Sequence, residues 1–457
     1  MTAIHDQAMH YIYQQVLERL LNHMSRAQRA SLQLLIQRLL VAAGGPEYMG
    51  TFRLLVLQGS DRRSTRLLAM LRAAQLSIAL RAPVTFQLRV LVVSLPYAGS
   101  ATLQSHERAF NALFMQDDPR VQLQMIEGRE VVPFSSRRWA APERRLRARD
   151  AMLMFGHLVD ARPEALLGSR LHLELADVLG FALQAPTDVL ITAIPARQRR
   201  RYLAWARRSL RLAGERGPHV DQCLAALAHG LGRLHGVVGG PLGTLSQQSA
   251  GTAPEGAPVG VIAIDDLLPH LLDEQQLDVM LGCGFDAAQD AWPLAAFVDP
   301  LAPAQLHELR AYSLEPRAGR PELRLASLPG GNKRDPQQMQ LGKAYGLNQA
   351  QLVCLLFRPF ARRGKNLERY LKYRHAEMLV ALPYLHRALQ GRPCPDAVKD
   401  WLVNTSGLPL RQLRLIYDGR LPVTVWRLMN NLARRDVHLR LLPRRSMRQR
   451  RGSAGLP

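Results

Sequence analysis

Strand-like and helix-like runs alternate along residues 47–236, and this alternation restricts the chain to a small group of folds. The apolar runs FRLLVL (52–57), FQLRVLVVSLP (86–96), VQLQMI (121–126) and DVLITAIP (188–195) read as strands, and a helical segment follows each of them. Strands that are separated by helices usually pair in parallel, because the helix carries the chain back across the sheet. The sequence therefore predicts an α/β layered domain over residues 47–236.

A helical segment precedes this domain and a linker follows it. Apolar residues recur at helical spacing over residues 3–43 and the sequence Gly-Gly-Pro at 44–46 ends the pattern, so we expect an N-terminal helical segment over residues 1–46. Residues 237–258 carry a single charge and are rich in Gly, Ser, Thr, Gln and Pro, a composition that cannot bury a core. We expect a flexible linker and a domain boundary there.

The alternation resumes after the linker, which predicts a second α/β domain over residues 259–443. Its first strand is VGVIAI (259–264), and residues 338–405 read as a wholly helical insertion. The run LRQLRLIYDG (410–419) reads as a strand in a compact strand-helix-strand unit, and residues 444–457 read as a disordered basic tail. The expected fold class is thus α/β, with two Rossmann-like layered domains, an N-terminal helix and a helical insertion in the second domain.

The positive charge of the chain is concentrated in four short segments. The net charge is +23. Segments 137–149, 197–216, 358–374 and 440–451 carry +5, +7, +6 and +6, so the remainder of the chain is close to neutral. Charge gathered in this way is typical of a surface that binds a polyanion such as nucleic acid.

No catalytic or cofactor signature stands out in the sequence. It contains no P-loop, no GxSxG elbow and no HExxH pair, and its four cysteines form no CxxC motif. No N-terminal signal sequence is evident, and the longest apolar runs are far shorter than the roughly 20 residues of a membrane helix. We therefore expect a cytoplasmic, non-enzymatic protein with no cofactor and no membrane insertion.

Two carboxylates at the end of a predicted strand are the candidates for a metal site. Asp265 and Asp266 follow the run VGVIAI, and α/β folds commonly place site carboxylates at that end of a strand. They indicate either a magnesium or phospho-acceptor pocket or, as a structural alternative, the N-terminal cap of the following helix. An enzyme whose site combines them with Asp299 is a further hypothesis.

The segment MQLGKAYGLNQAQLVCLLFR (339–358) resembles the helix-turn-helix of repressor-type DNA-binding proteins. Gly346 would form the turn between two short helices, although Gly342 and Tyr345 stand where that motif usually has Ala and Leu. We expect the second helix to present amides near its N-terminus that pair with base edges in the major groove. These amides belong to Asn348, Gln349 and Gln351. A structural helical hairpin with no role in DNA recognition is the alternative.

The segment FRPFARRGKNLERYLKYR (357–374) follows and divides into a loop and a helix. Its helical half carries basic residues opposite an apolar face, as any amphipathic helix of a basic protein does. Its first half holds arginines around Pro359 and Gly364, where a non-helical loop can follow a phosphate backbone. We expect phosphate contacts from Arg358, Arg362, Arg363, Lys365 and Arg369.

These features predict a regulatory or accessory protein that binds DNA or another polyanion. The alternative is a scaffold or nucleotide-sensing component of a larger bacterial assembly, with protein partners or a ligand such as a cyclic dinucleotide. In that alternative the anion-binding residues are Arg197, Arg199, Arg200 and Arg201.

Overall fold

The structure of the chain is a computed structural model. It describes residues 3–59, 61–82, 84–93, 100–127, 130–137, 142–158, 163–212, 223–239, 259–267, 276–282, 347–420 and 428–431. Several predictions lie outside these residues: most of the linker, the first helix of the helix-turn-helix, Asp299 and the basic tail.

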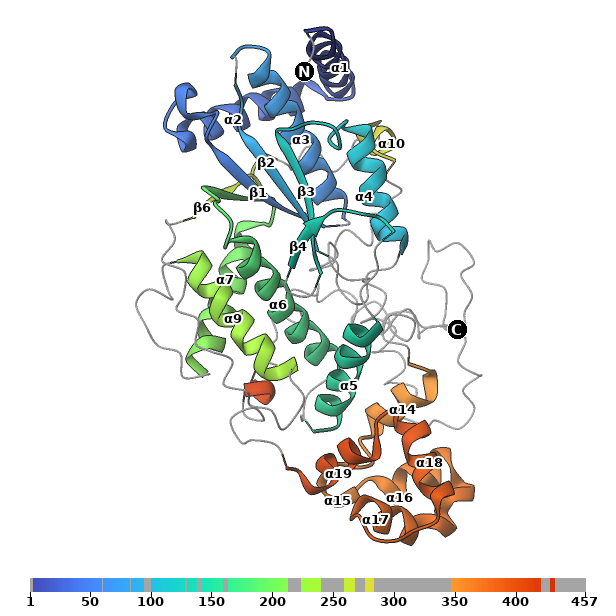
Figure 1. The fold of residues 1–457 in the computed structure, drawn as a ribbon. Helices are drawn as coiled ribbons and strands as arrows, with labels where there is room; N and C mark the ends of the chain where they lie inside the picture. Colours follow the sequence, from blue (N-terminus) through green and yellow to red (C-terminus); the bar gives the residue numbers. More distant parts are fainter. Residues whose placement is uncertain are drawn as a thin grey trace, which may run out of the picture.

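One six-stranded sheet organises the N-terminal part of the chain (Figure 1), and its strands lie in the order β4-β3-β2-β1-β5-β6. The strands are β1 (Arg53–Gln58), β2 (Gln87–Val92), β3 (Val121–Glu127), β4 (Glu130–Pro133), β5 (Val189–Thr192) and β6 (Gly260–Ala263). β1 pairs in parallel with both β2 and β5, whereas β4 runs antiparallel to β3. The chain moves outward from β1 to β3 and returns to the other side of β1, so the sheet is doubly wound with its switch point between β1 and β5.

Helices cover both faces of this sheet. Successive residues of a strand point to opposite sides, and on the central strand both sets of side chains are apolar, so each face packs against helices. On β1, Leu54 and Val56 belong to one buried cluster and Leu55 belongs to another. Side chains from α6 (Pro163–Ala182) and α9 (Leu224–Gly239) join the cluster around Leu55. The helices that join the first cluster are α1 (Ala3–Asn22), α2 (Arg26–Ala43), α3 (Arg62–Ala79), α4 (Ser100–Ala112) and α10 (Gln276–Met280).

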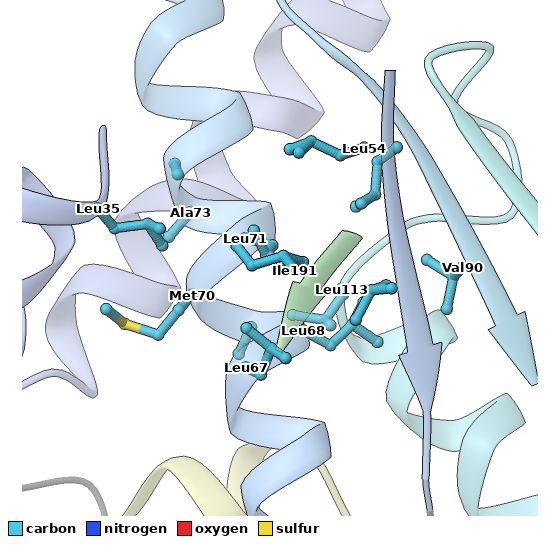
Figure 2. Close-up of a cluster of buried hydrophobic side chains, with 14 of the residues drawn as sticks. Leu35, Leu54, Leu67, Leu68, Met70, Leu71, Ala73, Val90, Leu113 and Ile191 are labelled. Atoms are coloured by element: carbon cyan, nitrogen blue, oxygen red, sulfur yellow. The ribbon is translucent and has the colours of Figure 1, made fainter. Parts of the chain in front are cut away.

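Helix α3 is buried on nearly all sides between the sheet and α2. Figure 2 shows its leucines facing Ile191 of β5 on one side, with α2 on the other. Two arginines of α3 are also buried, and each pairs with a carboxylate: Arg66 lies 2.8 Å from Asp278, and Arg72 lies 2.7 Å from Asp118. An unpaired charge in this position would be strongly destabilising, so these ion pairs allow a basic helix to lie in the core.

A compact group of helices, residues 347–420, forms the lower part of the molecule in Figure 1, and we call it the helical module. It comprises α14 (Gln349–Phe357), α15 (Ala361–Gly364), α16 (Leu367–Arg374), the 3-10 helix η3 (Ala376–Ala381), α17 (Leu382–Leu389), α18 (Asp396–Ser406) and α19 (Leu410–Asp418). Residues 152–154 of α5 (Pro142–Leu158) lie in its core. Gly156 of α5 also approaches Leu355 of α14 so closely that a Cβ atom would overlap it. Helix α5 thus ties the module to the α/β part of the chain.

The N-terminal segment is helical, but it forms two helices rather than the single one predicted over residues 3–43. Ser25 interrupts the run, because its hydroxyl accepts a hydrogen bond from the backbone N–H of Gln28 and its own backbone N–H donates one to the Gln28 side-chain oxygen. Such a capping box starts a new helix. The apolar spacing continues across the break, and for that reason the sequence reads as one helix.

Residues 410–418 form helix α19, so the strand predicted at this position is wrong. Pro409 precedes the first residue of the helix, and Gly419, at a φ angle of 67°, ends it in the left-handed conformation. The buried residues recur at helical spacing: Leu413, Ile416 and Tyr417. The short run of β-branched and aromatic residues at the end of this segment suggests a strand locally, but its packing against the module is helical.

The α/β class is confirmed, whereas a second Rossmann-like domain is not. β6, the strand expected to open that domain, instead pairs in parallel with β5 at the edge of the one sheet that the described residues form. Where the structure describes the predicted insertion, it consists of short helices joined by loops and turns rather than of continuous helix, and a further helix lies beyond it at Leu410–Asp418. The domain limits at 47–236 and 259–443 stay predictions.

Candidate polyanion-binding site

Three arginines with left-handed backbones lie in the segment that links α14 to α16, and we call residues 358–365 the basic loop. The φ angle is 51° at Arg358, which ends α14, 52° at Arg362 and 55° at Arg363. This conformation costs a residue other than glycine roughly 1–2 kcal/mol. Three such arginines in one loop therefore persist only because the surrounding structure imposes the conformation.

Contacts with neighbouring helices anchor the basic loop at its middle and its base. Phe360 is fully buried and packs against His157 of α5, with ring centroids 5.5 Å apart. The Asn366 amide donates a hydrogen bond to the carbonyl of Phe357 over 3.2 Å, which closes the loop between its two ends. The loop is thus part of the folded module rather than a free connection.

Gly364 brings the loop backbone directly onto α17 and α19. Its φ angle is 75°, and a Cβ atom there would lie 2.8 Å from Cε1 of His386 and 3.2 Å from Cε2 of Tyr417. These two side chains are joined by a hydrogen bond of 2.9 Å between the His386 Nδ1 and the Tyr417 hydroxyl. Burial lowers the pKa of His386 below its usual value, which favours a neutral imidazole beneath the loop.

Three charges of the basic loop are exposed to solvent. Arg362, Arg363 and Lys365 are exposed, and no acidic partner accompanies them in the part of the chain that the structure describes. Arg358 is half-buried; burial and then its charge lower the pKa of His157 to about 3. Arg362, Arg363 and Lys365 therefore present positive charge without an acidic partner among the described residues, which suits contacts with phosphate groups.

Helix α16 extends this basic surface. The guanidinium of Arg369 is exposed and lies 5.9 Å from the ring centroid of Tyr373. Lys372 pairs with Glu368 at 2.6 Å across one helical turn, so its charge is partly neutralised. Of the residues predicted to hold phosphate, the structure brings all five together on the basic loop and the first turn of α16.

The residues predicted to read bases have a different environment. Asn348 caps α14: its side chain accepts a hydrogen bond of 2.8 Å from the backbone N–H of Gln351, and its own backbone N–H donates one of 3.1 Å to the Gln351 side-chain oxygen. Gln351 also donates to the carbonyl of Asn404 in α18 at 3.3 Å, and Gln349 is the first residue of the helix. Residues 352–357 are all buried. These contacts favour the structural hairpin, since α14 can offer a DNA groove no more than its first turn.

Asp265 and Asp266 each form an ion pair with a different helix. Asp265 lies 2.5 Å from Arg199 of α7 (Ala196–Leu212) and accepts a hydrogen bond of 3.0 Å from the backbone N–H of Ala196. Asp266 pairs with Arg38 of α2. Burial raises the pKa of Asp265, but these hydrogen bonds outweigh it and hold the pKa below its usual value; the Arg38 hydrogen bond lowers that of Asp266. Among the described residues, no group of three or more His, Cys, Asp or Glu side chains is placed to hold a metal.

Carboxylates occupy both helix N-termini beside the switch point of the sheet. Asp265 caps α7, which follows β5, and Asp61 caps α3, which follows β1, by accepting a hydrogen bond of 3.0 Å from the backbone of Ser64. In doubly wound folds the phosphates of a nucleotide bind at these N-termini. A carboxyl group already accepts a hydrogen bond from a backbone N–H at each one, so these donors are not free for an incoming phosphate.

The ion pair between Arg199 and Asp265 also weakens the case for the alternative anion site, the arginines of α7. Arg199 is held by Asp265, and Arg201 is half-buried with an interaction of its own. Arg197 and Arg200 are exposed at the surface of the helix. Two separate arginines on a helix face offer less to a small phosphorylated ligand than the basic loop offers to an extended anion.

Sequence reasoning missed the residues that support the basic loop. His386 and Tyr417 lie under it, Asn366 closes it, and His157 packs against its centre from another part of the chain. The one local signal was Gly364, a glycine within a run of basic residues, which indicated a turn without indicating its contacts.

No protein-family model, no curated protein and no solved structure matches this chain. Among the helices that the structure describes, none combines the length and apolar character that crossing a bilayer requires.

Replacing the left-handed arginines by glycine should stabilise the protein. Glycine adopts this backbone region without strain, and after the larger entropy of the unfolded chain is subtracted we expect a gain of about 0.5–1 kcal/mol for Arg362→Gly or Arg363→Gly. Urea unfolding of the full chain measures the change. Arg81→Gly is the matched control, because Arg81 is an exposed loop arginine outside the positive-φ residues and its replacement should be neutral or destabilising. If Arg362→Gly and Arg363→Gly both lower the free energy of unfolding, the left-handed backbone at these positions is not strained.

Proposed function

We propose that the protein is a cytoplasmic, non-enzymatic regulatory or accessory factor that binds DNA or another nucleic acid through the basic loop and α16. The observation that carries the proposal is the pair Arg362 and Arg363, which extend exposed guanidinium groups from strained backbone positions. Strain of this kind is typical of functional sites, where it fixes a group in a useful position. Guanidinium groups make bidentate contacts with phosphate.

The charge of the helical module supports the same proposal. Residues 347–420 contain thirteen Lys and Arg residues against five Asp and Glu residues. A basic surface of this kind attracts phosphate backbones over several ångströms and binds them in a salt-dependent manner. The contacts would go to phosphate rather than to bases, so we expect binding with little preference for sequence.

Neutralising the two loop arginines should weaken nucleic-acid binding and reduce its dependence on salt. We expect Arg362→Asn combined with Arg363→Asn to lower the slope of log affinity against log salt by about two, one for each lost phosphate contact. Asparagine tolerates the left-handed conformation, so the loop backbone should be retained. Fluorescence anisotropy with a labelled oligonucleotide, titrated at several salt concentrations, measures the slope.

The control for this experiment is Arg81→Asn, which removes an exposed arginine from the turn after α3. It should leave the slope almost unchanged. A wild-type protein that shows no salt-dependent binding near physiological ionic strength would rule the proposal out. An equal effect of the control and the loop variants would rule out the basic loop as the site.

The scaffold or nucleotide-sensing function is the second candidate, with protein partners or a cyclic dinucleotide in place of nucleic acid. It has less support, because Arg199 is already paired with Asp265 and carboxylates cap the helix N-termini at the switch point. Calorimetry with a cyclic dinucleotide tests it directly, and binding that is abolished by Arg197→Gln and Arg200→Gln would favour it over the basic loop.

A further inference from the structure

Two exposed tyrosines lie on α16 and α17, the helix that follows the basic loop and a helix that contacts it, and an arginine accompanies each tyrosine. Tyr373 of α16 is 52% exposed and has the Arg369 guanidinium 5.9 Å from its ring centroid. Tyr384 of α17 is 44% exposed and has the Arg387 guanidinium 6.0 Å from its ring centroid. Each pair thus combines an aromatic plane with a cation at the surface.

The Tyr373 pair lies next to the start of the basic loop, and the helix that carries the Tyr384 pair contacts the loop at Gly364. The ring of Tyr373 lies 6.3 Å from that of Phe357, the residue immediately before the loop. Helix α17, which carries Tyr384, contributes His386 to the surface on which Gly364 rests. The two tyrosines therefore belong to the helices that lie directly beside the exposed arginines.

From this arrangement we propose that the helical module binds single-stranded nucleic acid in preference to duplex, an inference that rests on the proposed function. In a duplex the bases are stacked on one another and paired, so an exposed ring has no base face to contact. In a single strand the base faces are free, and tyrosine rings and guanidinium planes are the side chains on which they stack. The basic loop then holds the phosphates while Tyr373 and Tyr384 hold bases.

The environment of α14 supports the same choice. A duplex reader inserts an exposed helix or ribbon into a groove. The helix that the sequence offers for this role is buried from residue 352 to residue 357 and is capped by its own amides. Phosphate contacts and stacking need no inserted helix, so the module is better suited to a strand that lies across its surface.

The test compares single strands with a duplex on the full-length protein. Labelled DNA and RNA strands of about 20 nucleotides, and the matching DNA duplex, are titrated by fluorescence anisotropy at one salt concentration. We expect the single strands to bind at least about tenfold more tightly than the duplex. Tyr373→Ala and Tyr384→Ala should each weaken single-strand binding by about fivefold or more, while Tyr373→Phe and Tyr384→Phe retain it, because the phenyl ring still stacks.

Tyr11→Ala is the matched control, since Tyr11 is 64% exposed on α1, far along the chain from the module. It should change neither the affinity for single strands nor the affinity for the duplex. Thermal unfolding checks that every variant is folded. Duplex binding as tight as single-strand binding, or alanine variants that bind like the control, would overturn this inference and leave the proposed function intact. Absence of binding to all three nucleic acids would overturn both.

Discussion

Lowering the pH from about 7.5 to about 5 should destabilise the folded protein by roughly 4 kcal/mol through two buried histidines, His106 and His157. His106 lies 6.2 Å from Phe110, ring to ring, and burial lowers its pKa to about 4. Burial, reinforced by the charge of Arg358, lowers the pKa of His157 to about 3. In the folded structure neither ring nitrogen of His157 has a hydrogen-bond partner among the described residues.

The direction of the effect follows from the proton count of the two states. An unfolded histidine has a pKa of about 6.5, so below that pH the unfolded chain binds protons that the folded state excludes. Stability is fully present above about pH 6.5 and is lost as the pH falls toward the folded pKa values. At about pH 5 each histidine accounts for about 2 kcal/mol of the loss. Asp118, whose pKa is lowered to about 2, matters only at more acidic pH, because an unfolded aspartate titrates near pH 4.

Urea unfolding at the two pH values measures this loss. His157→Leu and His106→Leu remove one titrating group each, so each should reduce the pH-dependent difference in the free energy of unfolding by about half. His10→Leu, at an exposed position on α1, is the control and should leave the difference unchanged. The explanation fails if the double variant, His106→Leu with His157→Leu, loses as much stability between about pH 7.5 and about pH 5 as the wild-type protein does.

The strands of the sheet were predictable because their signal is local. Five apolar runs correspond to β1, β2, β3, β5 and β6 within a residue or a few at each end. Their order was not predictable, since pairing between β5 and β6 joins residues about 70 positions apart and leaves no trace in either run. Reading β6 as the start of a new domain followed from the linker composition alone.

The charged residues of the candidate site were predictable from the sequence, but the contacts that hold the basic loop in place were not. Arginines around a proline and a glycine indicated an exposed loop, and Arg362 and Arg363 lie there. The spacing of the amides at 348 and 351 fits both a recognition helix and a capping box, because both place polar residues in a first helical turn. Burial of the remaining α14 residues favours the second interpretation, and burial depends on α5 and α18, which no local pattern reports.

Gly364→Ala should be strongly destabilising, by about 2–4 kcal/mol, because a methyl group there meets both a backbone and a packing penalty. The φ angle of 75° disfavours alanine, and the new Cβ would lie 2.8 Å from His386 and 3.2 Å from Tyr417. These rings cannot move apart without breaking their own hydrogen bond of 2.9 Å. The variant should therefore lift the basic loop from α17 and α19 and also weaken nucleic-acid binding, although it removes no charge.

The matched control for Gly364→Ala is Gly419→Ala, at the end of α19. Gly419 has a similar φ angle of 67°, and an added Cβ would meet nothing within 4 Å. We expect this variant to lose only about 1 kcal/mol, the backbone penalty alone. The difference between the two free energies of unfolding thus measures the contact between the loop and its support. If the two variants lose equal stability, Gly364 is required only for its backbone angle, and the packing of His386 and Tyr417 does not hold the arginines in place.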